Sequence, residues 1–360
     1  MQNSAASLIS AIRPYRAILI LIKGSPDPDA IASAYAMSII CKAHGIASTI
    51  LAEKKLSLPQ NKAFVQLLDI PLHFAPMHHL HHFSAYIVVD HQNAAGGDLV
   101  GGLPCAAHID HHEPGGPEVK TNVTMRDTKA GSTSTILTRI LREMDISLDH
   151  RTMTTLATAL LYGIYTDTDK YAHAAEQDYE ALEYLSRRAD HAVFKRLTNI
   201  PLSSETLGLL KHAIAQKIIY KDWLIAGLGF VAATNRDSIA VIADFLLRRE
   251  AANTVVVYAL IEDRQRKSLS LDASFRTSLE SLDLNDLIKR ITPGGGARSF
   301  KGAYQIGLDY FAHAPNRGLL WECVSDTTMA ILKHRRDEIL ITEVKGMFRR
   351  LRGIFRKRQP

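Results

Sequence analysis

Residues 16–30 read RAILILIKGSPDPDA, an apolar run followed by a loop with two prolines and two aspartates. The run is rich in isoleucine and leucine and far too short to cross a membrane, which predicts a strand buried in a sheet. Pro26 and Pro28 restrict the backbone that follows it. The carboxylates of Asp27 and Asp29 are therefore expected to project from a rigid turn at the end of this strand.

Strand and helix patterns alternate through the first 190 residues. After the first strand at 16–23, the sequence predicts a helix at 29–44, strands at 48–52, 85–90 and 106–110, and helices at 133–144 and 152–162. This alternation is typical of an α/β fold with a parallel sheet covered on both faces. Ligands of such sheets bind just beyond the carboxyl ends of the strands, so we expect a site at that edge.

The remaining sequence predicts a second, smaller α/β unit. A helical connector interrupted at Pro201 leads into strands at 223–232, 254–262, 267–275 and 304–309, with helices at 238–248 and 284–290. The expected domains are 1–190, a connector at 191–221, a second domain at 222–315 and a C-terminal extension at 316–360.

The composition is that of a folded globular protein. Of the 360 residues, 46% are hydrophobic and 22% are charged, which argues against a disordered chain and against a membrane protein. No apolar run reaches the roughly 20 residues that cross a bilayer, and the start lacks a secretion signal, so we expect a cytoplasmic protein. The widely spaced Cys41, Cys105 and Cys323 are expected to be buried free thiols.

The net charge of +6 comes from the C-terminal tail. Residues 341–360 hold seven basic side chains against one acidic side chain, so the rest of the chain is neutral. Apolar residues recur there at three- and four-residue spacing, at Val344, Met347, Phe348, Leu351, Ile354 and Phe355. The pattern predicts a basic amphipathic helix that contacts RNA or an anionic membrane, or else packs on its own domain or on a dimer partner.

Acidic motifs follow the predicted strands and helices in four places. These are Asp27 with Asp29, then Asp90, then the triplet Asp110-His111-His112, then Asp167 with Asp169. Mn²⁺ and similar hard cations bind carboxylate oxygens and accept imidazole, and two ions about 4 Å apart can activate water for phosphoryl transfer. One aspartate after a strand is usually a helix cap. Capping does not explain four such motifs, whose charges would repel one another without a cation.

The order of these motifs resembles that of the DHH phosphoesterase superfamily, whose signature runs D-x-D, a lone Asp, D-H-H and T-D-T. Residues 166–168 (TDT) supply the last motif, and residues 130–134 (AGSTS) resemble the small-residue stretch that follows the triplet in this family. The resemblance covers residues 15–310. It implies a parallel-sheet DHH domain followed by a smaller α/β DHHA1 domain that binds substrate.

By this resemblance the metal ligands are Asp27, Asp29, Asp90, His111 and Asp167. Asp90 would bridge two Mn²⁺ ions and Asp27 would hold one of them. The other ion would be held by Asp29, His111 and Asp167. Mg²⁺ is an alternative to Mn²⁺, and a single bound ion is an alternative to two.

The same resemblance makes Asp110 and His112 the catalytic candidates. Asp110 would support the histidine pair, and His112 would face the substrate phosphate or donate a proton. Lys23 stands where the family usually has a metal-binding histidine. A protonated ammonium cannot bind an ion, so the first metal site is expected to be weak or empty. Asp169 stands in place of a family glycine and adds a carboxylate.

Residues 294–296 are three consecutive glycines, which let the backbone approach a ligand closely and point N–H groups at a phosphate. They resemble the GGGH loop of the DHHA1 domain, with Ala297 in place of the histidine. Arg276 stands where that domain carries a phosphate-binding arginine. The resemblance therefore implies that Arg276, Gly294, Gly295 and Gly296 bind substrate.

The two-domain layout looks most like the family members that degrade nanoRNA and dephosphorylate 3′-phosphoadenosine 5′-phosphate (pAp). The resemblance thus implies a phosphoesterase that hydrolyses short single-stranded RNA or pAp by two-metal attack of water on phosphorus. A homodimer is left open. The alternative is a nucleotide- or nucleic-acid-binding protein with weakened or lost catalysis, because Lys23 and Ala297 replace family histidines.

Overall fold

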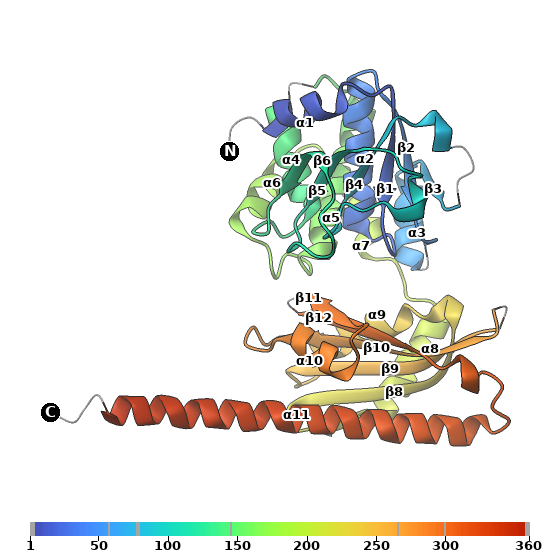
Figure 1. The fold of residues 1–360 in the computed structure, drawn as a ribbon, viewed down its shortest axis with the longest axis vertical. Helices are drawn as coiled ribbons and strands as arrows, with labels where there is room; N and C mark the ends of the chain where they lie inside the picture. Colours follow the sequence, from blue (N-terminus) through green and yellow to red (C-terminus); the bar gives the residue numbers. More distant parts are fainter. Residues whose placement is uncertain are drawn as a thin grey trace. The chain divides into compact units, whose positions relative to one another are not determined.

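The computed structural model describes residues 4–56, 58–76, 80–144, 146–264, 266–298 and 300–356, without the side chains of Arg298 and of residues 341–356. The chain divides into two compact units, Met1–Pro201 and Leu202–Pro360, which are labelled by element in Figure 1. Each unit has its own sheet and its own hydrophobic core.

The first unit is built on a six-stranded sheet with the order β3-β2-β1-β4-β5-β6. The strands are β1 (Ala17–Ile22), β2 (Ala47–Ala52), β3 (Leu72–Phe74), β4 (Ala85–Val89), β5 (Cys105–Asp110) and β6 (Thr121–Arg126). Every neighbouring pair is parallel, so the predicted parallel sheet is confirmed. The edge strands β3 and β6 were not predicted, because neither contains a buried apolar run.

Two different layers cover this sheet. The helices of the first unit are α1 (Ser4–Ile12), α2 (Pro28–Ala43), α3 (Pro59–Leu67), α4 (Thr133–Glu143), α5 (His150–Asp167), α6 (Glu176–Ser186) and α7 (His191–Thr198), with 3₁₀ turns η1 (Leu80–His82) and η2 (Gly97–Leu99). Ile18, Ile20 and Ile22 of β1 point into a core shared with α2, α4 and α5, the helices labelled beside the sheet in Figure 1. Leu19 and Leu21 point the other way, where loop residues cover the sheet. This alternation follows from the two-residue period of a strand.

The second unit contains a mixed sheet with the order β11-β12-β10-β9-β8-β7. Its strands are β7 (Ile218–Tyr220), β8 (Trp223–Ala232), β9 (Thr254–Asp263), β10 (Ser268–Thr277), β11 (Gly296–Arg298) and β12 (Lys301–Gly307). β8 and β9 are parallel, and the other neighbouring pairs are antiparallel. The predicted span of β8 matches the observed bounds, whereas the short strands β7 and β11 were not predicted.

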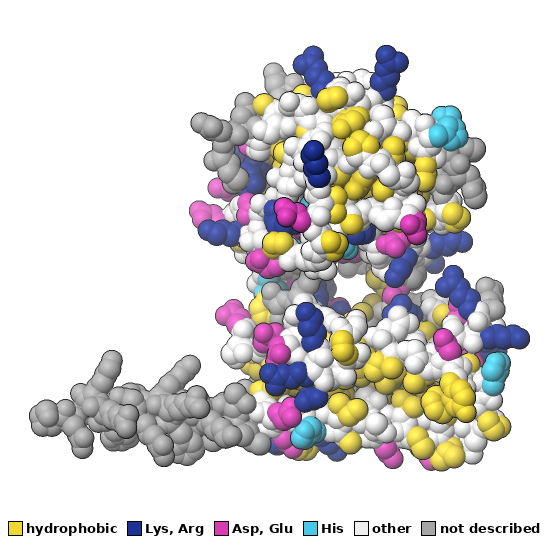
Figure 2. All heavy atoms as spheres, viewed as in Figure 1, with side chains coloured by type: hydrophobic (Ala, Val, Ile, Leu, Met, Phe, Trp, Pro, Cys, Tyr) yellow, Lys and Arg dark blue, Asp and Glu magenta, His cyan; other side chains and the backbone are white. Residues whose placement is uncertain are grey.

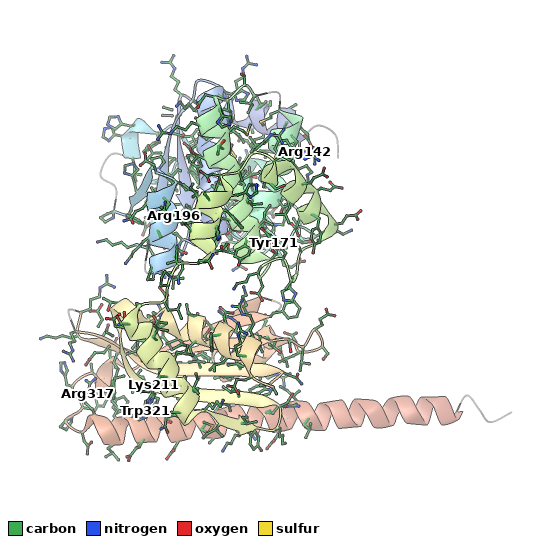
Figure 3. The ribbon with its side chains drawn as sticks, turned by 180° about the vertical axis from the view of Figure 1, so that it is seen from behind. Arg142, Tyr171, Arg196, Lys211, Arg317 and Trp321 are labelled. Atoms are coloured by element: carbon green, nitrogen blue, oxygen red, sulfur yellow. The ribbon has the colours of Figure 1, made fainter. Side chains whose placement is uncertain are left out.

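Helices pack on both faces of this second sheet. They are α8 (Ser204–Gln216), α9 (Ser238–Arg249), α10 (Leu284–Ile291) and α11 (Arg317–Arg356), with 3₁₀ turns η3 (Ala233–Asn235) and η4 (Asp309–Phe311). On the α11 side, Trp321 stacks on Tyr258 with ring centroids 5.7 Å apart (Figure 3). The same helix buries Leu332 and pairs Arg336 Nε with Asp222 Oδ1 at 2.5 Å.

The segment expected to be a connector at 191–221 holds two separate helices. α7 packs on α5 in the first unit, and α8 packs on β8 in the second. The expected extension at 316–360 is largely α11, and the side chains of its predicted amphipathic pattern lie outside the described residues. Cys41 and Cys105 are buried as predicted. The prediction is wrong for Cys323, which is exposed because it lies on the outer side of α11.

The described part of the chain contains no helix that is both long enough and apolar enough to cross a bilayer. On the face drawn in Figure 2, basic and acidic side chains are interspersed over each unit instead of separated by sign. That distribution agrees with a neutral body, as expected from the charge count without residues 341–360.

Candidate functional site

The acidic motifs meet at the carboxyl edge of the parallel sheet. β1, β4 and β5 lie side by side in the order β1-β4-β5. Asp90 follows β4 directly, Asp110 is the last residue of β5, and β1 leads through a short turn into α2. Asp90 adopts a φ of 52°, a left-handed conformation that turns the chain sharply at the strand end. The topology thus places three of the four motifs at neighbouring strand ends.

Asp27 is the N-cap of α2. Its Oδ1 accepts a hydrogen bond from the backbone N–H of Ala30 at 2.9 Å, and Pro28 occupies the first helical position, where no N–H is needed. The hydrogen bond and the proline thus fix the start of α2 directly after this turn. At least one oxygen of this predicted ligand serves the helix.

Asp29 is buried, with 1% of its surface exposed, and its carboxylate binds the start of α4. Oδ2 accepts the N–H of Thr133 at 2.7 Å, and Oδ1 accepts the N–H of Ser134 at 2.9 Å. The first N–H groups of a helix carry partial positive charge, so they hold a carboxylate well. A Cβ at Gly163 would lie 3.1 Å from Asp29 Oδ1 and overlap the Ser134 hydroxyl, which explains the glycine there.

Thr133 and Asp178 support the site; the sequence analysis quoted Thr133 only as part of the stretch 130–134 and missed Asp178. Thr133 Oγ1 donates to Asp90 Oδ1 at 3.0 Å. Asp178, fully buried on α6, accepts from the Gly131 N–H at 3.0 Å and from the Thr135 hydroxyl at 2.6 Å. It therefore holds the loop that presents α4 to Asp29. In the sequence it resembles any acidic residue in the first turn of a helix, so no local signal could have found it.

His111 lies among the carboxylates. Its Nε2 is 2.9 Å from Asp167 Oδ2, at the end of α5, and 3.5 Å from Asp90 Oδ1. Its Nδ1 is 3.1 Å from the carbonyl of Ala130, an acceptor, so Nδ1 carries the hydrogen and Nε2 faces the acidic side chains. A backbone acceptor behind one ring nitrogen is the usual support of a metal-binding histidine.

Two groups of side chains have the spacing that one cation requires. The ligand atoms of Asp29, His111 and Asp167 lie within 4.8 Å of one another, and so do those of Asp90, His111 and His112. Among the residues that the structure describes, Asp27 belongs to neither group. Four of the five predicted metal ligands thus share one small volume. Carboxylates with imidazole form a donor set that fits Mn²⁺ or Mg²⁺.

The protonation equilibria of this cluster reflect its excess of negative charge. Burial, with the charge of Asp167, raises the pKa of Asp29 to about 7. Burial and the charge of Asp29 raise the pKa of Asp90 well above its usual value. Burial opposes protonation of His111, but the hydrogen bond and charge of Asp167 outweigh it and raise that pKa to about 10. A divalent cation would supply the positive charge that protons supply otherwise.

Asp110 orients His112. Asp110 is completely buried, and its Oδ1 is 2.5 Å from His112 Nδ1. Burial would raise the pKa of Asp110, but the hydrogen bond from His112 outweighs it and lowers the pKa. The aspartate is therefore ionised and turns the Nδ1 side of the ring inward. In this position Asp110 supports the His112 ring, which is the role that the resemblance implies for it.

Lys23 and Asp169 lie outside both ligand groups of the described residues. Lys23 follows β1, where burial lowers its pKa and the charge of Glu53 opposes that shift. Asp169 begins a run of three left-handed residues, with Lys170 and Tyr171, whose φ values are 48°, 60° and 71°. Such a run costs about 1 kcal/mol or more per residue. It reverses the chain directly after Asp167, and Tyr171 (labelled in Figure 3) packs its ring 5.3 Å from that of Tyr165.

Arg276 in the second unit contacts its own neighbours. Its exposed fraction is 8%, and its Nε and Nη2 pair with Asp244 at 2.6 and 3.2 Å. Nη1 donates to the Ser274 hydroxyl at 2.8 Å and to the carbonyl of Phe275 at 2.9 Å. The predicted phosphate-binding guanidinium therefore already has a carboxylate partner within the unit.

The three glycines differ in their surroundings. A Cβ at Gly295 would lie 2.5 Å from Ile288 Cγ2 and 2.9 Å from Tyr304 Cβ, so this glycine allows close packing. A Cβ at Gly294 would meet nothing within 4 Å. Beside the loop is a cavity of about 320 Å³, lined by Glu280, Leu282, Asp283, Leu284, Asn285, Ala297 and Phe300. The Asn285 side chain accepts the N–H of Ala297 at 3.1 Å there.

Comparison with known proteins gives a family match over part of the chain and a common fold. Residues 17–164 match the model of the DHH family, N-terminal domain. An uncharacterized protein of Methanocaldococcus jannaschii is 30% identical over 320 residues, which are 87% of this chain but only 63% of that protein. The crystal structure of an exopolyphosphatase-related protein from Bacteroides fragilis superposes with a TM-score of 0.71 at 16% identity, covering 93% of this chain and 97% of that one. This likeness shows a common fold.

Proposed function

Because residues 17–164 match the model of the DHH family, N-terminal domain, we propose that the chain is a metal-dependent phosphoesterase. The observation that carries this proposal is the meeting of Asp29, Asp90 and Asp167 around one imidazole in a buried cluster. Carboxylates so placed repel one another, and burial raises the pKa values of two of them. A divalent cation removes that cost and is also what phosphoryl transfer requires.

Different residues of the cluster would have different roles in metal binding. Asp29, His111 and Asp167 would hold one Mn²⁺ or Mg²⁺ ion, with Asp90 beside it. Such an ion lowers the pKa of bound water and neutralises charge on phosphorus-bound oxygens. The N–H groups of α4 fix the Asp29 carboxylate, and the Ala130 carbonyl fixes the His111 ring, so the ligands need little rearrangement to bind.

His112 would act on the substrate side. Asp110 accepts the hydrogen of Nδ1 and so fixes the ring, at 3.8 Å from the Asp90 carboxylate. From this position we assign to His112 a hydrogen bond to a phosphate oxygen, with proton donation to the leaving oxygen as the later step. Asp110 remains ionised and does not touch substrate.

The finer proposal concerns the substrate. We propose short single-stranded RNA or pAp, on the resemblance of the two-domain layout to the nanoRNA-degrading members of the superfamily. Within the second unit, the cavity beside residues 294–297 is a separate candidate site for a nucleoside. Glu280 and Asp283 line it, and carboxylates favour donor groups such as ribose hydroxyls and base amino groups over phosphate.

The test is hydrolysis of defined substrates. Purified protein with Mn²⁺ should release mononucleotide from a labelled trinucleotide RNA, or phosphate from pAp. Asp90→Ala should lower kcat at least roughly 1,000-fold, because an essential ligand and its negative charge are lost. Asp98→Ala is the matched control, since Asp98 is exposed on η2 and outside the cluster. Equal rates for wild type and Asp90→Ala would exclude this chemistry.

A binding protein with weak or lost catalysis is the second candidate, favoured by one observation. Lys23 replaces a family histidine, and Asp27 is outside the ligand groups among the described residues, so the first ion has few ligands. Elemental analysis after dialysis against Mn²⁺ separates the readings. One or two ions per chain supports the enzyme, and none supports the binding protein.

A further inference from the structure

Arg126 places a guanidinium at the edge of the candidate site. It is the last residue of β6, an edge strand, and the direct partner of Asp110 in the parallel β5–β6 pairing. Its side chain is 22% exposed, so it is only partly withdrawn from solvent. None of the motifs quoted from the sequence includes this position.

Two contacts locate the guanidinium. Nε lies 3.5 Å from Asp110 Oδ2, and Nη2 donates to the carbonyl of Gln92 at 3.1 Å. The other oxygen of Asp110 holds His112 at 2.5 Å. Arg126 is therefore separated from His112 by a single carboxylate group, and it binds the loop that directly follows Asp90.

These neighbours leave several hydrogen-bond donors of the Arg126 guanidinium without a close acceptor. A charge-assisted N–H···O bond is usually 2.7–2.9 Å long, and the Nε of Arg126 is buried without a hydrogen bond among the described atoms. Arg276 is the contrasting case, because it meets Asp244 through two nitrogens and two further acceptors through Nη1. No contact of the described residues uses Nη1 of Arg126, which leaves two N–H donors.

An unsatisfied guanidinium beside His112 fits one chemical class of ligand. Arginine matches the oxygens of a phosphate with paired N–H donors. We propose that Arg126 is a substrate-binding residue that contacts a non-bridging oxygen of the phosphoryl group facing His112. This inference rests on the proposed function for the identity of the substrate, but the anion site itself can be measured without turnover.

Binding of inorganic phosphate is the first measurement. Isothermal titration of the Mn²⁺-loaded protein should show roughly 10- to 100-fold weaker phosphate binding for Arg126→Met, since a hydrogen-bonded charge is lost. Arg126→Lys should retain part of the affinity. Arg188→Met is the matched control, because Arg188 is also half-buried in the first unit but packs on the ring of Tyr184 at 3.9 Å.

Enzyme kinetics distinguish a substrate-binding role of Arg126 from a purely structural one. With pAp as substrate, Arg126→Met should lower kcat/KM by a similar factor, and added guanidinium ion should restore part of the rate. The melting temperature of each variant is measured as well, to show that the variant is folded. If Arg126→Met does not fold, Arg126→Gln replaces it, since the amide nitrogen of glutamine falls near the position of Nε and can keep a polar contact to Asp110 without the charge.

The outcomes distinguish the two proposals. Equal phosphate affinity of the wild type and the folded Met or Gln variant would contradict the proposed phosphate-binding role of Arg126. A wild-type protein that does not bind phosphate would contradict it as well. Arg126-dependent phosphate binding without hydrolysis of any ester leaves this inference standing and contradicts the proposed function.

Discussion

The aspartates of the two units meet different partners. In the second unit, the carboxylates of Asp244, Asp272 and Asp222 each contact an arginine, which is Arg276, Arg236 and Arg336 respectively. In the first unit, Asp29, Asp90 and Asp167 surround one histidine. The second unit therefore supplies arginine counter-charges to these aspartates, whereas the aspartates of the cluster in the first unit face His111, where a bound cation would reduce their mutual repulsion. A buried carboxylate is structural where its partner is built in and functional where the partner must come from outside.

The largest effect that this contrast predicts is on ion binding. Asp29→Asn should lower Mn²⁺ affinity roughly 100-fold or more, because a charged ligand is lost and an amide cannot accept both α4 N–H groups. Titration calorimetry with Mn²⁺ measures this change. Asp98→Asn should bind as wild type does. Unchanged affinity in Asp29→Asn would mean that the cluster is not the ion site.

A comparable change in the second unit should affect stability instead. Arg276→Met leaves Asp244 without its partner and should lower the free energy of unfolding by about 2–4 kcal/mol. Arg264→Met removes an exposed pair and should cost less than about 0.5 kcal/mol. Urea denaturation measures both. If Mn²⁺ restored the stability of Arg276→Met, the proposed difference between the aspartates of the two units would be contradicted.

The metal-free protein should lose stability as pH rises. The pKa of Asp29 is about 7 when folded against 3.8 when unfolded, so the folded state binds the extra proton between pH 4 and 7. The pKa of His111 is about 10 against 6.5, which acts in the same direction between pH 6.5 and 10. Unfolding with EDTA should therefore be easiest at high pH. Because Mn²⁺ displaces these protons, its affinity should increase with pH. A metal-free stability that rises from pH 5 to pH 9 would contradict this account.

The smallest expected effects concern the glycine loop. Gly295→Ala should destabilise the second unit by about 1–3 kcal/mol, because its Cβ collides with Ile288 and Tyr304. Gly294→Ala should change stability by less than about 0.5 kcal/mol, since its Cβ meets open space. If Gly294→Ala weakens pAp binding without a change in melting temperature, the loop contacts ligand. Equal destabilisation by both substitutions would contradict the packing difference.

Long apolar runs made the central elements predictable. β1 lies within the predicted span of 16–23, and β8 has the predicted bounds, because a strand buried on both faces must be apolar throughout. The missed strands β3, β6, β7 and β11 are short or half-exposed. Their pairing is decided by the strand beside them and leaves little trace in composition.

The candidate site divides in the same way. The residue types and their order indicated Asp29, Asp90, His111 and Asp167, and three of the four motifs follow neighbouring parallel strands. Arg126 and Asp178 were missed, and Thr133 was quoted only as part of the stretch 130–134. Their contacts to the site join residues 16, 47 and 43 positions apart in the chain, respectively. Arg276 was indicated by its motif, and the structure shows its guanidinium bound to Asp244.

The sequence alone determined the parallel sheet and indicated the edge at which the acidic residues would gather, because periodicity and residue identity are local properties of the chain. Which side chains surround each carboxylate was decided only by the tertiary structure. Charge compensation depends on distances of a few ångströms between residues far apart in the chain, and a linear pattern does not contain those distances.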